Sequence, residues 1–239
     1  MITAAELGHL RRHVGQARAS GKSIGLVPTM GALHEGHLSL IRRARAECGF
    51  TVVSIFVNPL QFGATEDLGR YPRRPEEDAA MLAREGADLL YLPEAAAMYP
   101  PDFSTAVEVR GVSEGGEGAV RPGHFRGVAT VVAKLFLQVS PDAAYFGRKD
   151  LQQVAVIRRM TRDLDFPLRL VVAETVREPD LLALSSRNAY LSPEERRQAA
   201  LFPKALFAAR DRVSAGEADA GRLGRDTRAA LEGAGFAVD

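Results

Sequence analysis

Cysteine is almost absent from the sequence. Cys48 is the single cysteine among 239 residues, so the chain can form neither an internal disulfide nor a thiolate-rich metal cluster. Such sparing use of cysteine is typical of proteins in a reducing compartment, and we expect this one in the cytoplasm.

The sequence also has no excess of charge of one sign. Lysine and arginine total 31 and aspartate and glutamate total 30, for a formal net charge of +1. A chain this close to neutral has no overall field to hold a nucleic acid or an anionic membrane surface, so we expect neither as a partner. Any site for an anion must therefore be built locally.

Long apolar runs and an export signal are missing as well. The run from Val128 to Leu137 is interrupted by Lys134 and is far shorter than the roughly 20 residues that cross a bilayer. The opening Met-Ile-Thr-Ala-Ala-Glu lacks the basic start and apolar run of a secretory signal. Since 46% hydrophobic and 26% charged residues are ordinary for a globular chain, we expect a soluble, folded protein.

Short apolar segments alternate with helical ones along most of the chain. Strands are expected near 23–27, 51–57, 87–92, 143–146 and 168–176, and helices near 3–19, 36–48, 75–85, 128–137 and 151–164. Thr3 and Glu6 have the spacing of a capping box, which predicts the start of the first helix. The alternation predicts an α/β fold with a Rossmann-like, doubly wound parallel sheet.

The character of the chain changes toward its end. Residues 111–127 are rich in glycine and predict a loop, and from Pro193 onward the sequence is rich in alanine and arginine at helical spacing. We expect two domains, a Rossmann-like one over 1–175 and a smaller α+β one over 176–239.

Two of the five histidines, His34 and His37, lie in one loop between a predicted strand and a predicted helix. Backbone amides and the helix dipole favour anions at such a place, and Gly36 lets a ligand approach the backbone. Capping or surface histidines are the plainer alternative, but the pairing favours a phosphate site. Zinc is less favoured, because no cysteine or third histidine is near in sequence.

Five motifs occur in an order that resembles the pantothenate synthetase family, within the superfamily of His-x-Gly-His nucleotidyltransferases. They are Pro-Thr-Met-Gly-Ala-Leu-His-Glu-Gly-His (28–37), Phe-Val-Asn-Pro-Leu-Gln-Phe (56–62), Arg-Pro-Gly-His-Phe-Arg-Gly (121–127), Phe-Gly-Arg-Lys-Asp-Leu-Gln-Gln (146–153) and Leu-Ser-Ser-Arg-Asn (184–188). The resemblance covers about residues 23 to 210.

The resemblance implies a fold, a reaction and partners. Pantoate and ATP would give pantoyl adenylate and pyrophosphate, and β-alanine would then displace AMP to form pantothenate. It also implies Mg²⁺, a homodimer, a nucleotide- and pantoate-binding first domain and a C-terminal lid domain. A different acceptor, handled by another nucleotidyltransferase of this superfamily, is the alternative that the histidine pair alone would permit.

The resemblance also assigns residues to roles. His37, His34 and Lys149 would be catalytic, with His37 the proton donor. Asp150 would hold the metal ion, although a carboxylate at a helix start is also a common cap. ATP would contact Met30, Gly31, His34, His37, Gly147, Lys149, Asp150, Val176, Leu184, Ser185, Ser186 and Arg187. Pantoate would contact Met30, Asn58, Gln61 and Gln153, with Gln61 also helping to place β-alanine.

Several residues near these motifs are left outside the predicted site. Gln152 is expected to be structural or to face solvent, and Glu76, Glu77 and Asp78 to form a solvated acidic helix start. His124 and Arg126 lie in the glycine-rich segment, which the resemblance places in a flap or wall near the site, although Arg121 and Arg126 could equally be charges on the loop surface.

The sequence departs from the family pattern in two places. Leu181 stands where the family commonly has glycine, so a backbone that needs positive φ would be strained there. The chain also ends at Asp239, where family members continue, and we expect a shortened C-terminal domain.

Overall fold

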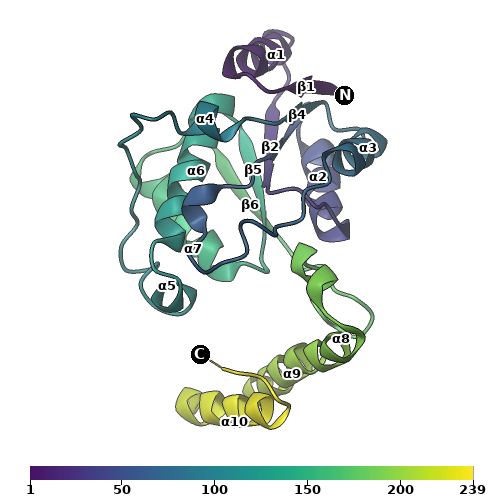
Figure 1. The fold of residues 1–239 in the computed structure, drawn as a ribbon, viewed down its shortest axis with the longest axis vertical. Coiled ribbons are helices and arrows are strands. Elements are labelled where there is room, and N and C mark those ends of the chain that lie inside the picture. The colour runs from purple at the N-terminus through teal and green to yellow at the C-terminus, as the bar shows by residue number, and fades with distance from the viewer. Residues whose placement is uncertain (239) are drawn as a thin grey trace. The chain divides into compact units, whose positions relative to one another are not determined.

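The computed structural model describes residues 1–238, which divide into two compact units, Met1–Thr175 and Val176 onward (Figure 1). The first unit contains β1 Ile2–Ala4, α1 Leu7–Ala19, β2 Ile24–Thr29, α2 Glu35–Glu47, β3 Phe50–Ile55, the 3₁₀ helix η1 Pro59–Gln61, α3 Pro75–Glu85, β4 Leu89–Tyr91, α4 Ala95–Met98, α5 Glu117–Val120, α6 His124–Val139, β5 Ala143–Gly147, α7 Leu151–Asp163 and β6 Arg169–Ala173. The second contains the 3₁₀ helix η2 Ser186–Tyr190, α8 Pro193–Ala199, α9 Leu201–Ser214 and α10 Ala220–Gly233. None of the helices within 1–238 is long and apolar enough to cross a membrane.

The first unit is built on one parallel sheet of six strands in the order β1-β4-β3-β2-β5-β6. The chain leaves β2 toward β3 on one side and returns to β5 on the other side, so the order reverses between β2 and β5. The predicted α/β fold with a doubly wound parallel sheet is confirmed. In such sheets, ligands bind beyond the carboxyl ends of the strands where the order reverses.

Helices cover both faces of the sheet, because successive side chains of a strand point to opposite faces. On one face, Leu10 of α1 and Phe136 of α6 belong to the core cluster that includes Leu26. On the other face, Ile41 of α2 and Leu82 of α3 belong to the cluster that includes Val27. Burying one such side chain stabilises the folded state by about 1.5–3 kcal/mol. The helices on both faces therefore anchor the sheet whose edge carries the predicted site.

The start of the chain differs from the expectation. Ile2–Ala4 form a strand that pairs with β4, and α1 begins only at Leu7, with no side-chain cap from Glu6. The predicted capping box of Thr3 and Glu6 is therefore wrong, because pairing with the sheet overrides a local capping pattern.

The second unit is helical over most of its described length. Up to residue 238, extended pairing in this unit is limited to one isolated bridge between Arg177 and Ala183, so the strands expected of an α+β domain are not seen there. The bridge closes a tight turn in which Glu178 N–H donates to Leu182 O.

Leu181 sits in this turn with φ +76°, in the left-handed region. Its N–H donates to Glu178 O and its carbonyl accepts from the Arg177 side chain. These bonds keep Leu181 in a backbone conformation that glycine would adopt without strain. The strain expected from the sequence is present in the structure.

We predict that Leu181→Gly raises the free energy of unfolding of the second unit by about 1 kcal/mol, since it removes the left-handed penalty and the Leu181 side chain is exposed. The shift of the urea midpoint at constant slope measures it. Leu181→Ala is the matched control, because it removes the same exposed side chain but keeps Cβ. Equal stability of the two variants would contradict the strain.

Candidate active site

The predicted site residues of the first unit lie on segments that end or follow β2, β3 and β5, at the carboxyl edge of the sheet where the strand order reverses. The loop with Met30, Gly31 and His34 follows β2, and Gly147, Lys149 and Asp150 follow or end β5. Gln153 lies in the first turn of α7 and is partly buried. The sheet topology therefore joins segments that are more than a hundred residues apart in sequence.

The loop after β2 has an unusual backbone that a buried carboxylate holds in place. Gly31 and Ala32 both have positive φ, +84° and +48°. Asp78 of α3, only 1% exposed, accepts hydrogen bonds from Ala32 N–H at 2.9 Å and Leu33 N–H at 2.8 Å. These bonds stabilise a conformation that costs an alanine free energy, and they fix the entry of the chain into α2.

Backbone hydrogen bonds fix the orientation of both histidine rings at the start of α2. Gly36 N–H donates to His34 Nδ1 at 3.1 Å, and His34 N–H donates to His37 Nδ1 at 3.4 Å. Because a backbone N–H can only donate, each Nδ1 is an acceptor, and each neutral ring carries its hydrogen on Nε2. The rings lie side by side, with centroids 4.1 Å apart.

Both rings are held neutral. Burial, the neighbouring His34 ring and the Lys149 cation lower the pKa of His37 to about 3. Burial and Lys149 also lower the pKa of His34, which Asp150 partly offsets. At neutral pH the pair offers two N–H hydrogen-bond donors and carries no charge, so His37 in the free protein is a donor of a hydrogen bond more than of a proton.

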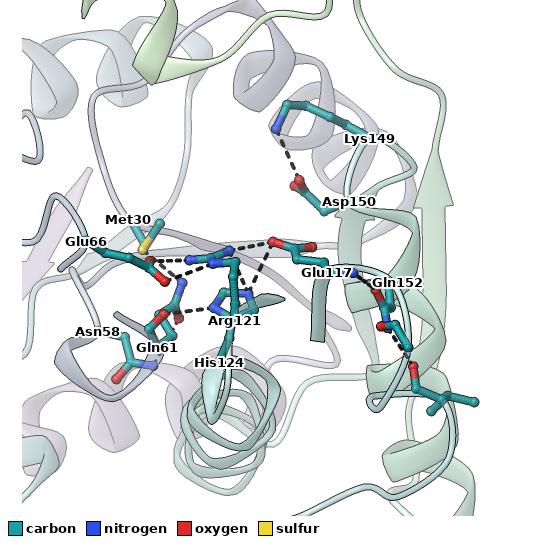
Figure 2. Close-up of polar contacts among 12 residues, drawn as sticks. Met30, Asn58, Gln61, Glu66, Glu117, Arg121, His124, Lys149, Asp150 and Gln152 are labelled. Atoms are coloured by element: carbon teal, nitrogen blue, oxygen red, sulfur yellow. Dashed lines mark hydrogen bonds and ion pairs between the residues drawn. The ribbon is translucent and has the colours of Figure 1, made fainter. Parts of the chain in front are cut away.

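Lys149 and Asp150 form an ion pair beside the histidines, with Lys149 Nζ 3.1 Å from Asp150 Oδ1 (Figure 2). Both side chains remain about half exposed, so a ligand can reach them. The Lys149 charge adds to burial in lowering the pKa of both His34 and His37. An accessible cation and two fixed N–H donors suit the oxygens of a polyphosphate.

The donor set fits magnesium only in part. Among residues 1–238 no three His, Cys, Asp or Glu side chains are grouped to hold a metal ion. Mg²⁺ is commonly held by one or two carboxylates together with substrate phosphates, so the accessible Asp150 fits one protein ligand of such a complex.

Gln61 lies at the end of η1, and its side chain contacts Asn58, the cap of η1, and Met30, from the loop after β2 (Figure 2). Its Nε2 donates to Met30 Sδ at 3.2 Å, and its Oε1 accepts from Asn58 Nδ2 at 3.0 Å. The structure thus brings together Met30, Asn58 and Gln61, which the sequence assigned to pantoate.

A cluster of ion pairs ties the glycine-rich segment to the same place (Figure 2). Arg121 binds both carboxylate oxygens of Glu66 and also contacts Glu117. His124 lies against Arg121 on one side, and its Nδ1 donates to Gln61 O at 2.8 Å. The Arg121 cluster therefore holds the backbone of Gln61.

Gln152 serves the same segment from α7. Its Nε2 donates to the carbonyls of Val112 and Gly115, and its Oε1 accepts from Glu117 N–H. Of the two expected roles, structural and solvent-facing, these bonds favour the structural one. The segment 111–127, expected to be a loop, also contains the short helix α5 and the first turn of α6.

The other predicted ATP residues belong to the second unit. Leu184 N–H donates to Val176 O at 3.1 Å, which closes the turn that contains Leu181. Ser185 caps η2 by accepting from Arg187 N–H, and Ser186 and Arg187 form the first turn of that helix. The tight turn thus holds Val176 and the Leu-Ser-Ser-Arg segment together.

Sequence reasoning missed the roles of two residues. Asp78 was counted with a solvated acidic run, although it stands four residues before Leu82 and so shares the buried face of α3; this spacing was a usable signal. Tyr99, whose hydroxyl donates to Asn58 Oδ1 at 2.8 Å, carries no signal, because it lies in none of the five motifs.

We predict that Asp78→Asn lowers the free energy of unfolding by about 1–3 kcal/mol, because an amide has one acceptor oxygen and turns its NH₂ toward the second backbone N–H. Urea unfolding measures the loss. Glu76→Gln, an exposed neighbour in the same helical turn, is the control and should change little. If both variants lost the same stability, the loss would come from removing a negative charge at the start of α3. The hydrogen bonds to the loop would then not be its cause.

Comparisons with known proteins agree with this arrangement. The family described as pantoate-beta-alanine ligase matches residues 3–239. The pantothenate synthetase of Acidobacterium capsulatum is 61% identical over 202 residues, which are 84% of this chain and 68% of that protein. That of Deinococcus radiodurans is 58% identical over 212 residues, 87% of this chain and 75% of the relative.

Solved structures are similar too. The pantothenate synthetase of Thermus thermophilus has a TM-score of 0.92 at 51% identity, over 98% of this chain and 83% of that one. The pantoate-beta-alanine ligase of Francisella tularensis, crystallised with beta-gamma ATP and beta-alanine, has a TM-score of 0.84 at 33% identity, over 96% and 86%. With nearly its whole length matched in sequence and in structure, this chain belongs to the pantoate-β-alanine ligase family, the pantothenate synthetases.

Proposed function

We propose that this chain joins pantoate to β-alanine in two steps at the edge between β2 and β5. ATP first transfers its adenylyl group to the pantoate carboxylate and releases pyrophosphate, and the β-alanine amine then displaces AMP. The observation that carries the proposal is the pair of neutral, backbone-oriented histidines facing Lys149 in a chain of this family.

In the first step a carboxylate oxygen of pantoate attacks the α-phosphorus and the bond to the pyrophosphate oxygen breaks. Such transfers need positioning and charge stabilisation from the protein more than covalent chemistry. His34 and His37 donate their Nε2–H groups to phosphate oxygens, and Lys149 neutralises charge that builds on the leaving pyrophosphate. These groups are in place before the reaction, so little reorganisation is needed.

Pantoate binds between Met30, Gln61 and Gln153, the last from the first turn of α7. Neutral amides suit an acceptor with hydroxyl groups, whereas the alternative nucleotidyltransferases act on phosphorylated acceptors that call for cations. In the second step the amine attacks the acyl carbon, loses a proton and expels AMP, with Gln61 also helping to place β-alanine.

The rest of the ATP site combines backbone, hydroxyl and charged groups. Gly147 leaves room beside β5, since a side chain there would meet nothing within 4 Å, and Asp150 with the phosphates would hold Mg²⁺. The family resemblance also assigns ATP contacts to Val176, Leu184, Ser185, Ser186 and Arg187 of the second unit, and a lid role to that unit. The single cysteine supports a cytoplasmic protein, and the family resemblance supports a homodimer.

We predict exchange of labelled pyrophosphate into ATP that requires pantoate and Mg²⁺ but not β-alanine. Reversible adenylate formation alone produces this exchange, so it isolates the first step. Reactions with β-alanine alone and with neither substrate are the controls. Exchange driven by a phosphorylated acceptor in place of pantoate would favour the alternative transferase.

We predict that His37→Ala lowers the rate of this exchange by about a hundredfold or more, the usual effect of removing one preorganised donor to a transition state. His9→Ala, on α1, is the control for loss of a histidine and should keep the wild-type rate. Near wild-type exchange by folded His37→Ala would remove His37 from the catalytic role.

A further inference from the structure

Asn58, at the start of η1, is 1% exposed and has its amide fully engaged inside the protein. Its Oδ1 accepts from Leu60 N–H at 3.3 Å and from the Tyr99 hydroxyl at 2.8 Å. Its Nδ2 donates to Gly127 O at 3.1 Å and to Gln61 Oε1 at 3.0 Å. Two hydrogens and two lone pairs are the whole capacity of an asparagine amide, so Asn58 has none left for a substrate.

Two backbone groups determine which way the Asn58 amide points. Leu60 N–H can only donate and Gly127 C=O can only accept, so the oxygen must face Leu60 and the nitrogen must face Gly127. The second hydrogen on that nitrogen then needs an acceptor, which fixes the Gln61 oxygen toward Asn58. Gln61 must therefore turn its Nε2 away from Asn58, on the side where Met30 lies.

We propose that Asn58 and Tyr99 are positioning residues that set the polarity of Gln61, so that Gln61 meets pantoate with an N–H donor. The proposal rests on the function proposed above, and it replaces the expectation that Asn58 itself binds substrate. The group that Gln61 contacts on pantoate is accordingly an acceptor oxygen, of the carboxylate or of a hydroxyl.

Tyr99 is well placed for this part. Its ring packs against Phe56 and Phe103, with centroids 5.9 and 5.1 Å away, which holds the hydroxyl on Asn58. Burial raises the pKa of the Tyr99 phenol, so the group stays protonated and remains a donor. Tyr99 thus supplies a second donor to the Asn58 oxygen, in the direction that the two backbone groups already set.

The backbone around Gln61 is held as firmly as its side chain. A Cβ on Gly127 would lie 2.1 Å from Leu60 O, so only glycine lets α6 approach η1 closely enough for its carbonyl to reach Asn58. From the same helix, His124 donates to Gln61 O. Helix α6 therefore holds the Gln61 backbone through His124. Gly127 of α6 and Tyr99 together hold the Asn58 amide, which sets the polarity of the Gln61 side chain.

Tyr99→Phe tests the proposal. The rate of pantoate-dependent pyrophosphate exchange is measured as a function of pantoate concentration and, separately, of ATP concentration, which gives a KM for each substrate. The variant should raise the KM for pantoate about tenfold, the effect of leaving one buried acceptor short of a partner, and keep the KM for ATP within about twofold. Tyr145→Phe is the matched control, since it removes a phenol hydroxyl bonded to Glu47 and Cys48 and should match wild type. An unchanged KM for pantoate in Tyr99→Phe would overturn the proposal, because Gln61 would then be oriented without the Tyr99 hydroxyl.

A double-mutant cycle separates positioning from general destabilisation. In a Gln61→Ala background, Tyr99→Phe should cause no further loss of kcat/KM for pantoate, because it acts through Gln61. If Tyr99→Phe lowered kcat/KM for pantoate equally in the wild-type and Gln61→Ala backgrounds, its role would be merely structural. The same would follow if it lowered kcat/KM for ATP as much as for pantoate, and either result would overturn the proposal.

Asn58→Asp inverts the polarity and gives a second, isosteric test. A carboxylate can accept from Leu60 and Tyr99 but cannot donate to Gln61, whose amide would then turn its oxygen toward pantoate; we expect a larger rise in the KM for pantoate than in Tyr99→Phe. A KM equal to wild type would refute the assignment. Absence of pantoate-dependent exchange in the wild-type protein would instead refute the proposed function, so the two failures are distinct.

Discussion

The two hydrogen bonds from Ala32 and Leu33 to the buried carboxylate of Asp78 are the constraint on which the site depends. They hold two successive residues with positive φ at the end of β2, and so decide where α2 begins. Because α2 starts at Glu35, His34 becomes its cap, and backbone N–H groups fall on the inner nitrogens of both histidines. A carboxylate on α3 thus orients two rings that it does not touch.

The same principle operates at the other end of the site. In both places a main-chain group of fixed polarity dictates which atom of a side chain faces the protein, and the opposite atom is left for the ligand. The histidines present Nε2–H, and Gln61 presents Nε2–H through Asn58. The site is therefore lined by donors, which suits a carboxylate and a polyphosphate, since both offer only acceptor oxygens.

Periodicity and motif order predicted most of the fold, because strands buried on both faces and helices with one apolar face leave a clear pattern in sequence. Helix α3 was expected at 75–85, as observed, and Leu181 was expected to be strained. Three of the misses share one physical cause, which is a partner distant in sequence. Thr3 joined a strand through β4, Asp78 met the loop after β2, and Tyr99 met Asn58. The spacing of Asp78 and Leu82 indicates that Asp78 is buried, but no local pattern identifies its partner.

The near-neutral composition of the chain is compatible with an anion site built from neutral donors. A permanent charge is expensive to bury, whereas a neutral N–H group with its other nitrogen satisfied costs little. With the pKa of His37 at about 3, the histidine pair carries no charge in the free protein, and Lys149 stays half exposed beside Asp150. In the proposed reaction, pyrophosphate would meet mainly neutral hydrogen-bond donors and one exposed ion pair, so the donors that stabilise its formation would not prevent its release.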